Sequence, residues 1–315
     1  MLLIVSPNLC LDRIVVVRAF ATGRVHRAES ATELASGKGL NVARAARALG
    51  VDVTVVGIVG GGDGANAIVA GAWAHGVRLN PVRVPGPVRV CTLIIDPGHE
   101  ETVINEPGPP VSAENVQTLV DHIGAELKHA QAVVLAGSLP PGMPATLYAD
   151  VIRQAQTIPV ILDATGEALR LGMAARPSLV KANRLELQDA VGRPLDSAEG
   201  LRQAAQEIRR MTGGSVLITL GDRGALLVTA EGARQIVPPQ VERVNTIGAG
   251  DSLTAGLASG MLQNLPLLEA ARLGIAAAAA DVTTLLPGTV DPDLVERLAA
   301  RVKVEDVGAG PEVFV

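Results

Sequence analysis

Short apolar runs, mostly of β-branched residues, recur along the chain and alternate with polar segments of helical periodicity. Continuous apolar runs of this length suit strands that are covered on both faces. We predict such strands at residues 2–5, 53–59, 132–136, 160–163, 179–181 and 216–220. Strands that alternate with helices in this way indicate an α/β fold built on a parallel sheet.

The helical pattern is clearest at residues 112–129. Five apolar residues between positions 116 and 127 fall on one face there, and Ser112 precedes them as a cap. Gly50 and Gly76 are placed to end two further helices.

Two stretches, residues 13–34 and 88–105, break this alternation. The second carries turn residues at 96–99 between two short apolar strands, a pattern typical of a hairpin. We predict that both stretches form antiparallel strands of one small sheet, a lid beside the main body. The whole chain, residues 1–315, is then a single domain whose lid strands come from about 12–35 and 87–106.

Composition narrows the classes of function. The net charge is −5 and no Lys/Arg-rich block occurs, which argues against a nucleic acid or an anionic membrane as partner. Cys10 and Cys91 form neither a disulfide framework nor a C-x-x-C pair, so we expect a reducing, cytoplasmic location. The apolar run at residues 2–5 is too short for a signal peptide, and we expect no membrane span.

The most informative segment is NTIGAGDS at residues 245–252, a glycine-rich turn at the start of a predicted helix. Unpaired N–H groups at a helix start bind anions, and small residues let a phosphate approach. Asp251 alone reads as a helix cap. Beside an anion site formed by Gly248, Ala249 and Gly250, it is placed to accept a hydroxyl proton during phosphoryl transfer. We therefore predict a kinase site with Asp251 as its base.

This segment resembles the carboxy-terminal signature of the ribokinase-like (PfkB) carbohydrate kinases, in their phosphofructokinase B branch, of the form D/N-T-x-G-A/S-G-D. Further segments match the same family in the same order over nearly the whole chain. The resemblance implies a doubly wound, mostly parallel sheet flanked by helices, with a small β-sheet lid. It also implies ATP and Mg²⁺ as cofactors, a small sugar phosphate as substrate, and a homodimer that pairs through the lid sheet.

Motifs in the first half of the chain match the family's sugar-binding positions. SGKGLNVA at residues 36–43 is similar to G-G-K-G-x-N-V-A, NLCLD at 8–12 to N-P-A-x-D, and GSLPPG at 137–142 to a sugar-phosphate loop. Arg27 and Arg89 match positions that, in the sugar-phosphate branch of the family, bind the phosphate that the substrate already carries. Taken alone, each of these features is also an ordinary turn or a solvated side chain. By resemblance, the sugar ligands are Asp12, Arg27, Gly37, Lys38, Gly39, Asn41, Arg89 and Ser138.

Motifs in the second half match the family's nucleotide site. KANRLE at residues 181–186 is similar to K-P-N-x-x-E, and TLGDRG at 219–224 to S/T-L-G-x-x-G. Asn183 and Glu186 share a helix face, where they suit hydrated Mg²⁺ and equally a capping box. Residues 163–169 match a further branch motif, which we interpret as architectural. By resemblance, the nucleotide ligands are Lys181, Asn183, Thr219, Gly221, Gly224 and Gly250, and the metal ligands, through water, are Asn183 and Glu186.

Other classes of protein share parts of this pattern. Residues 62–67 fit the G-x-G-x-x-A of an NAD-dependent oxidoreductase, but they follow the second predicted strand and lack the acidic residue expected about twenty positions later. A non-catalytic sugar-phosphate or nucleotide sensor would not need Asp251. Residues 104–109 look most like kinases of fructose 1-phosphate, which we therefore expect as substrate, with tagatose 6-phosphate and fructose 6-phosphate as alternatives.

Overall fold

A large sheet forms the centre of the protein. The computed structural model describes residues 1–97 and 101–307. Within these residues ten strands make up the large sheet. In chain order they are β1 (Leu2–Val5), β4 (Val53–Gly61), β5 (Arg78–Pro87), β8 (Ala132–Gly137), β9 (Val160–Ala164), β10 (Leu179–Asn183), β11 (Ser215–Thr219), β12 (Ala225–Thr229), β13 (Gly232–Val237) and β14 (Lys303–Asp306).

The order of these strands creates a switch point. Across the sheet the order is β14-β13-β12-β11-β10-β9-β8-β1-β4-β5. All pairs from β11 to β5 are parallel, which confirms the predicted parallel sheet, and β12 to β14 add an antiparallel edge that the sequence did not reveal. From β1 the chain continues to β4 on one side and later to β8 on the other. Ligands of open α/β sheets bind at such a reversal, outside the carboxyl ends of the strands.

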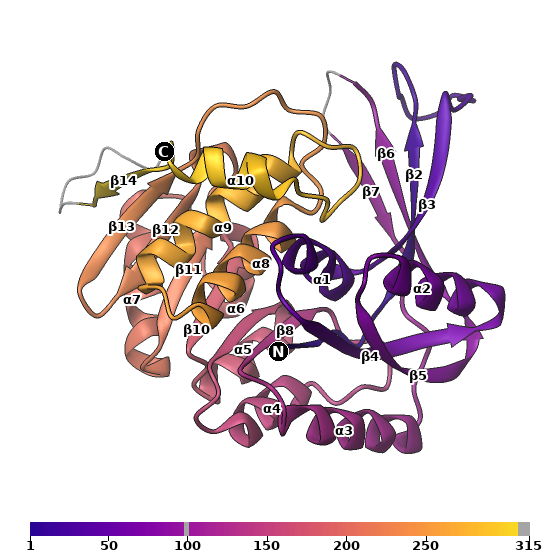
Figure 1. Ribbon diagram of the computed structural model, residues 1–315, viewed down its shortest axis with the longest axis horizontal. Helices are drawn as coiled ribbons and strands as arrows, with labels where there is room; N and C mark the ends of the chain where they lie inside the picture. The colour runs from indigo at the N-terminus through magenta and orange to yellow at the C-terminus, as the bar shows by residue number, and fades with distance from the viewer. Residues whose placement is uncertain (98–100, 308–315) are drawn as a thin grey trace.

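Helices cover both faces of the sheet (Figure 1). One apolar core joins a face of the sheet to α1 (Lys38–Ala48), α2 (Gly62–Ala74), α8 (Ala249–Leu262), α9 (Leu267–Asp281) and α10 (Pro292–Ala299). A second core joins the other face to α3 (Ala113–Leu127), α4 (Leu147–Ala155), α5 (Gly166–Ala174), α6 (Arg184–Val191) and α7 (Ala198–Thr212). The predicted helix at 112–129 is α3, and Ser112 caps it through the amide of Asn115. A short 3₁₀ turn, η1 (Gly221–Arg223), follows β11.

A lid sheet of four strands stands off the main body (Figure 1). Its order is β3 (Ser30–Ser36), β2 (Cys10–Val16), β6 (Arg89–Ile95) and β7 (Thr102–Asn105). The outer pairs are antiparallel as predicted, but the central strands β2 and β6 are parallel. Parallel strands need a crossover connection, and between β2 and β6 the chain passes through the complete β4-α2-β5 unit. Part of the predicted turn at 96–99 lies outside the described residues.

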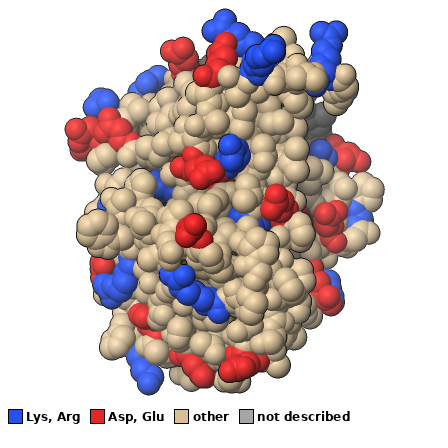
Figure 2. Space-filling view, turned by 90° about the vertical axis from the view of Figure 1, so that its right-hand side faces the viewer, with Lys and Arg blue, Asp and Glu red and all other residues tan. Residues whose placement is uncertain are grey.

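One face of the protein shows how its charged side chains are distributed. In Figure 2, Lys and Arg side chains are interspersed with Asp and Glu and form no broad field of one sign. Among the helices within residues 1–97 and 101–307, none combines the length and apolar character that crossing a bilayer requires.

Candidate active site

A cavity of about 670 Å³ lies at the switch point, between the carboxyl ends of the central strands and the lid sheet. Its walls come from segments that are far apart in the sequence, so the fold gathers most of the predicted site residues in one place. Those that line it are Asp12, Gly37, Lys38, Asn41, Arg89, Ser138, Lys181, Asn183, Glu186, Thr219, Gly248, Gly250 and Asp251.

A second cavity, of about 610 Å³, adjoins the first. The two share Asn183, Thr219 and Gly250 in their walls. The predicted nucleotide residues Gly221 and Gly224 line only the second cavity. Much of its wall is apolar and was not foreseen, because no motif marks these residues: Pro238, Pro239, Val241, Leu253, Ile275, Ala278, Ala279 and Val282.

The glycine-rich turn begins α8 at the junction of these cavities. Gly248 is the N-cap with φ of 96°, and a Cβ there would lie 2.7 Å from that of Pro287, so only glycine fits. The amide of Ala249 donates to Thr246 O at 3.3 Å and that of Asp251 to Gly248 O at 2.9 Å. Within the described chain, the amides of Gly248 and Gly250 have no hydrogen-bond partner. The amides of these two glycines are therefore free to donate to an anion, while the amide of Ala249 is used inside the turn.

Asp251 lies in the first turn of α8 with only 7% of its surface exposed. Asn41 Nδ2, from α1, donates a 2.9 Å hydrogen bond to its Oδ2. Burial raises the pKa of Asp251 to about 6, against the opposing effect of Lys38. The carboxylate is thus ionised at neutral pH and is a stronger base than an ordinary aspartate.

Asp163, in the segment interpreted as architectural, lies fully buried near the end of β9 and contacts three of the segments that carry the predicted site motifs. Its carboxylate accepts hydrogen bonds from Lys38 Nζ at 2.8 Å, Lys181 Nζ at 2.9 Å and Thr254 Oγ1 at 3.0 Å. Burial alone raises the pKa of Asp163, but the two ammonium groups outweigh it and hold that pKa well below its usual range. A Cβ on Gly250 would lie 3.1 Å from Lys181 Nζ, so this network holds a cation against the anion turn.

The lid side of the cavity carries a second carboxylate. Asp12 of β2 is buried, and burial raises its pKa. Ser36 Oγ donates to Asp12 Oδ2 at 2.5 Å. Arg89 of β6 is held by Asn8 O at 3.2 Å and Glu106 O at 2.7 Å, which fixes its guanidinium at the cavity wall.

The lid also contacts the anion turn directly. Thr246 donates to Glu101 through both its amide, at 2.9 Å, and its hydroxyl, at 3.0 Å. Arg243 lies 3.6 Å from the same carboxylate. Sequence reasoning missed Glu101, because its partners are about half the chain away and no local pattern links them.

Asn183 and Glu186 form the capping box that starts α6. Glu186 N donates to Asn183 Oδ1 at 2.8 Å, and Asn183 N donates to a carboxylate oxygen of Glu186 at 2.9 Å. The other carboxylate oxygen accepts from Lys38 at 3.2 Å. Both side chains line the first cavity, which we call the polar cavity because most of its lining residues are polar or charged. Their oxygen atoms suit Mg²⁺ held through its water shell.

Two predicted sugar ligands lie elsewhere. Arg27 is exposed in the connection between β2 and β3 and does not line the cavity of its own chain. Gly39 is buried in α1, where its amide donates to Ser6 Oγ and a Cβ would lie 2.2 Å from Ser6 Cβ. The close packing of α1 on the end of β1 explains this glycine.

Known proteins are similar to this chain over nearly its full length. A family model described as pfkB family carbohydrate kinase matches residues 3–293. The chain is 34% identical to 1-phosphofructokinase of Rhodobacter capsulatus, covering 98% of both chains, and 32% identical to that of Bacillus subtilis, covering 96% of this chain and 99% of the relative.

Solved structures show the same fold. Phosphofructokinase-2 from Escherichia coli in complex with substrates and products matches with a TM-score of 0.85 at 28% identity, over 95% of this chain and 98% of that chain. Ribokinase from Thermotoga maritima matches with a TM-score of 0.76 at 21% identity, over 95% and 99% of the two chains. The predicted fold class is confirmed.

Proposed function

Because the chain belongs to the pfkB family of carbohydrate kinases, we propose that it transfers the γ-phosphoryl group of ATP to fructose 1-phosphate. The products are fructose 1,6-bisphosphate and ADP. The observation that carries this proposal is the position of Asp251: a buried base beside the free amides of Gly248 and Gly250, where a polar cavity meets a largely apolar one. Full-length relatives named 1-phosphofructokinase support the choice of sugar.

In the proposed reaction Asp251 takes the proton of the sugar's free primary hydroxyl. The resulting oxygen attacks the γ-phosphorus, and the bond to the bridging oxygen of ADP breaks. The amides of Gly248 and Gly250, with Lys181 beside them, stabilise the charge on the transferring group. Asn41 holds the Asp251 carboxylate in place through its 2.9 Å hydrogen bond.

The polar cavity is the proposed sugar-phosphate site. Asp12 accepts hydrogen bonds from sugar hydroxyls, and Arg89 and Ser138 bind the phosphate that the substrate already carries. The placement of Arg89 supports this role, since backbone oxygens of two segments hold its guanidinium at the cavity wall. Lys38 and Gly37 line the same wall.

The second cavity is the proposed ATP site. Its apolar wall suits an adenine base, while Thr219, Gly221 and Gly224 supply the loop beside the phosphates. Asn183 and Glu186 are the residues that would hold Mg²⁺ through water. When bound, this ion neutralises phosphate charge.

The substrate is tested by release of ADP in a coupled assay with fructose 1-phosphate, fructose 6-phosphate, tagatose 6-phosphate and unphosphorylated fructose. We expect the highest kcat/KM for fructose 1-phosphate. The likeness to Escherichia coli phosphofructokinase-2, solved in complex with fructose-6-phosphate, makes fructose 6-phosphate the second candidate. Binding of these sugars without ADP release would reject the kinase proposal in favour of a sensor.

We also propose that two copies pair through the lid sheet. Exposed apolar side chains occur on the lid sheet and on the connection between β2 and β3: Ile104 is 56% exposed and Val25 96%. Ile104→Lys should convert dimers to monomers in analytical ultracentrifugation. Met211→Lys, on α7 and 46% exposed in the native chain, is the control. A monomeric native chain would contradict this proposal. The cytoplasmic location stays a prediction.

A further inference from the structure

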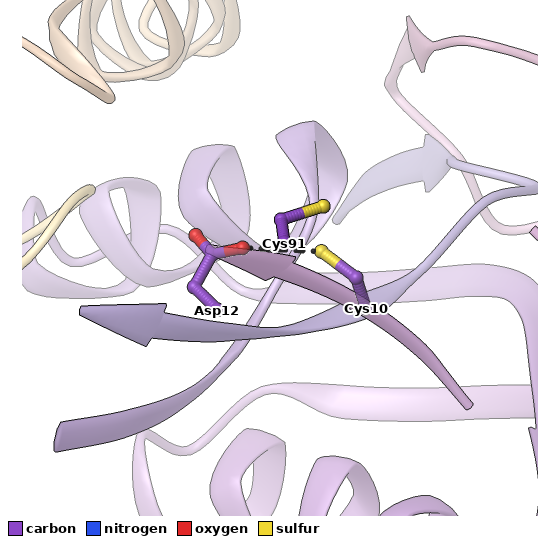
Figure 3. Close-up of side chains that lie close together, drawn as sticks. All are labelled: Cys10, Asp12 and Cys91. Atoms are coloured by element: carbon purple, nitrogen blue, oxygen red, sulfur yellow. Dashed lines mark hydrogen bonds between the residues drawn. The ribbon is translucent and has the colours of Figure 1, made fainter. Parts of the chain in front are cut away.

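Two thiols and a carboxylate converge on one face of the lid sheet (Figure 3). Cys10 and Asp12 are two residues apart on β2, and Cys91 lies opposite Asp12 on β6, so all three side chains project from the same face. One ligand atom from each lies within 4.8 Å of the other two, and Cys10 Sγ lies 3.2 Å from Asp12 Oδ1. All three residues are buried, and all three line the polar cavity.

The strand register argues against a disulfide as the purpose of this pair. Cys10 lies opposite Arg89, two positions away from Cys91. With strands about 4.8 Å apart and a rise of about 3.3 Å per residue, the two Cα atoms are roughly 8 Å apart. A disulfide needs Cα atoms closer than about 7 Å unless the backbone moves. Both cysteines are free thiols in the structure.

We propose that Cys10, Asp12 and Cys91 form a binding site for a soft divalent cation of the Zn²⁺ type. Thiolate and carboxylate ligands are those of tetrahedral Zn²⁺ sites, and three protein ligands leave a fourth position for water or another ligand. With metal–sulfur bonds of about 2.3 Å, tetrahedral ligand atoms lie a little under 4 Å apart. Spacings within 4.8 Å therefore close on a metal with small side-chain movements.

The surroundings of the cluster support this proposal. Ser36 Oγ donates to Asp12 Oδ2, which orients the carboxylate and leaves Oδ1 facing Cys10. Arg44 and Arg89 act electrostatically on Asp12. Their positive charge offsets the excess of negative charge that two thiolates and one carboxylate bring to a divalent ion.

Cys10 departs from the motif that its segment resembles. In the pattern N-P-A-x-D, which NLCLD at residues 8–12 resembles, the position of Cys10 is a small apolar alanine. The thiol therefore adds a soft ligand beside a carboxylate that serves another purpose. Because Asp12 is a proposed sugar ligand, a bound metal and the sugar phosphate should exclude each other. This exclusion rests on the proposed function, whereas metal binding itself does not.

The test uses Cd²⁺ with the purified full chain, since Cd²⁺–thiolate bonds give an ultraviolet charge-transfer band. We expect one Cd²⁺ per chain, with this band, and displacement by Zn²⁺. Removing a residue that only orients a metal ligand typically weakens metal binding about 10- to 100-fold. Cys10 and Cys91 are proposed as ligands themselves, so Cys10→Ala and Cys91→Ala should each lower the affinity for Cd²⁺ at least about 10-fold. The control is Thr92→Ala. Thr92 follows Cys91 on β6, so its side chain projects from the opposite face of the lid sheet, and this variant should bind Cd²⁺ normally.

A measurement on the native chain covers the case in which a cysteine variant does not fold. Cd²⁺ should protect both thiols from iodoacetamide. Equal alkylation with and without Cd²⁺, absence of the charge-transfer band, or unchanged affinity in both alanine variants would each overturn the proposal. Fructose 1-phosphate should weaken Cd²⁺ binding. Failure of this competition, with the band present, rejects the overlap with the sugar site and leaves the metal site standing.

Discussion

The buried carboxylate of Asp251 should make the protein less stable than a neutral side chain of the same shape would. Burial raises its pKa from 3.8 to about 6. Tenfold in an equilibrium constant corresponds to about 1.4 kcal/mol, so ionising this group inside the fold costs about 3 kcal/mol. Asp251→Asn removes this cost and keeps an oxygen that accepts from Asn41.

The sign of the effect follows from the two pKa values. The folded-state pKa lies above the unfolded value, so the cost is fully present above about pH 6 and vanishes below 3.8. In urea unfolding, Asp251→Asn should be more stable than the native chain by about 3 kcal/mol near pH 8, and by less than about 1 kcal/mol near pH 4.

The same substitution should nearly abolish activity. Loss of a general base lowers turnover by about 10²–10⁴, measured as ADP release. In the native enzyme, kcat/KM should fall about tenfold per pH unit below the pKa near 6. Asp189→Asn, exposed on α6, is the control and should change stability by less than about 0.5 kcal/mol at both pH values.

Two outcomes would refute this reasoning separately. Near-normal turnover of Asp251→Asn would show that another group accepts the hydroxyl proton. A stability difference that is the same near pH 4 and pH 8 would show that burial of the charge does not cause it.

Three further substitutions test the geometry around the cavities. Gly39→Ala places a Cβ 2.2 Å from that of Ser6 and should lower the free energy of unfolding in urea by about 1–3 kcal/mol. The control is Gly124→Ala on α3, which has open space around it and should not lower this free energy. Equal effects of the two substitutions would contradict the packing argument. Asp163→Asn removes the buried charge that pairs with Lys181, whereas Lys38 keeps Glu186. It should cost about 3–5 kcal/mol, so a loss under about 1 kcal/mol would show that Lys181 finds another partner. Arg89→Ala should raise KM for fructose 1-phosphate about 10-fold or more at similar kcat, and an unchanged KM would remove it from the phosphate site.

The features that sequence predicts well here depend on a few consecutive residues. The strands at 2–5, 132–136 and 160–163, the cap at Ser112 and the turn that starts α8 all appear close to their predicted positions. Each is determined by local apolar runs, capping side chains or glycines, which the sequence displays directly.

The features that escaped prediction depend on partners far along the chain. Asp163 pairs with Lys38, which lies 125 positions away in the chain, and no local sequence pattern indicates that contact. The parallel pairing of β2 with β6, and hence the meeting of Cys10 with Cys91, depends on the crossover between them. The apolar wall of the second cavity is formed by residues that read as ordinary loop and helix core.

The shared wall of the two cavities at Asn183, Thr219 and Gly250 bears on inhibitor design. A fragment that mimics a sugar phosphate and one that mimics adenine would lie on either side of this wall. A short tether across it would hold the second fragment at an effective concentration in the millimolar range, about what short flexible linkers achieve. Weak fragments joined in this way should gain affinity without any new contact.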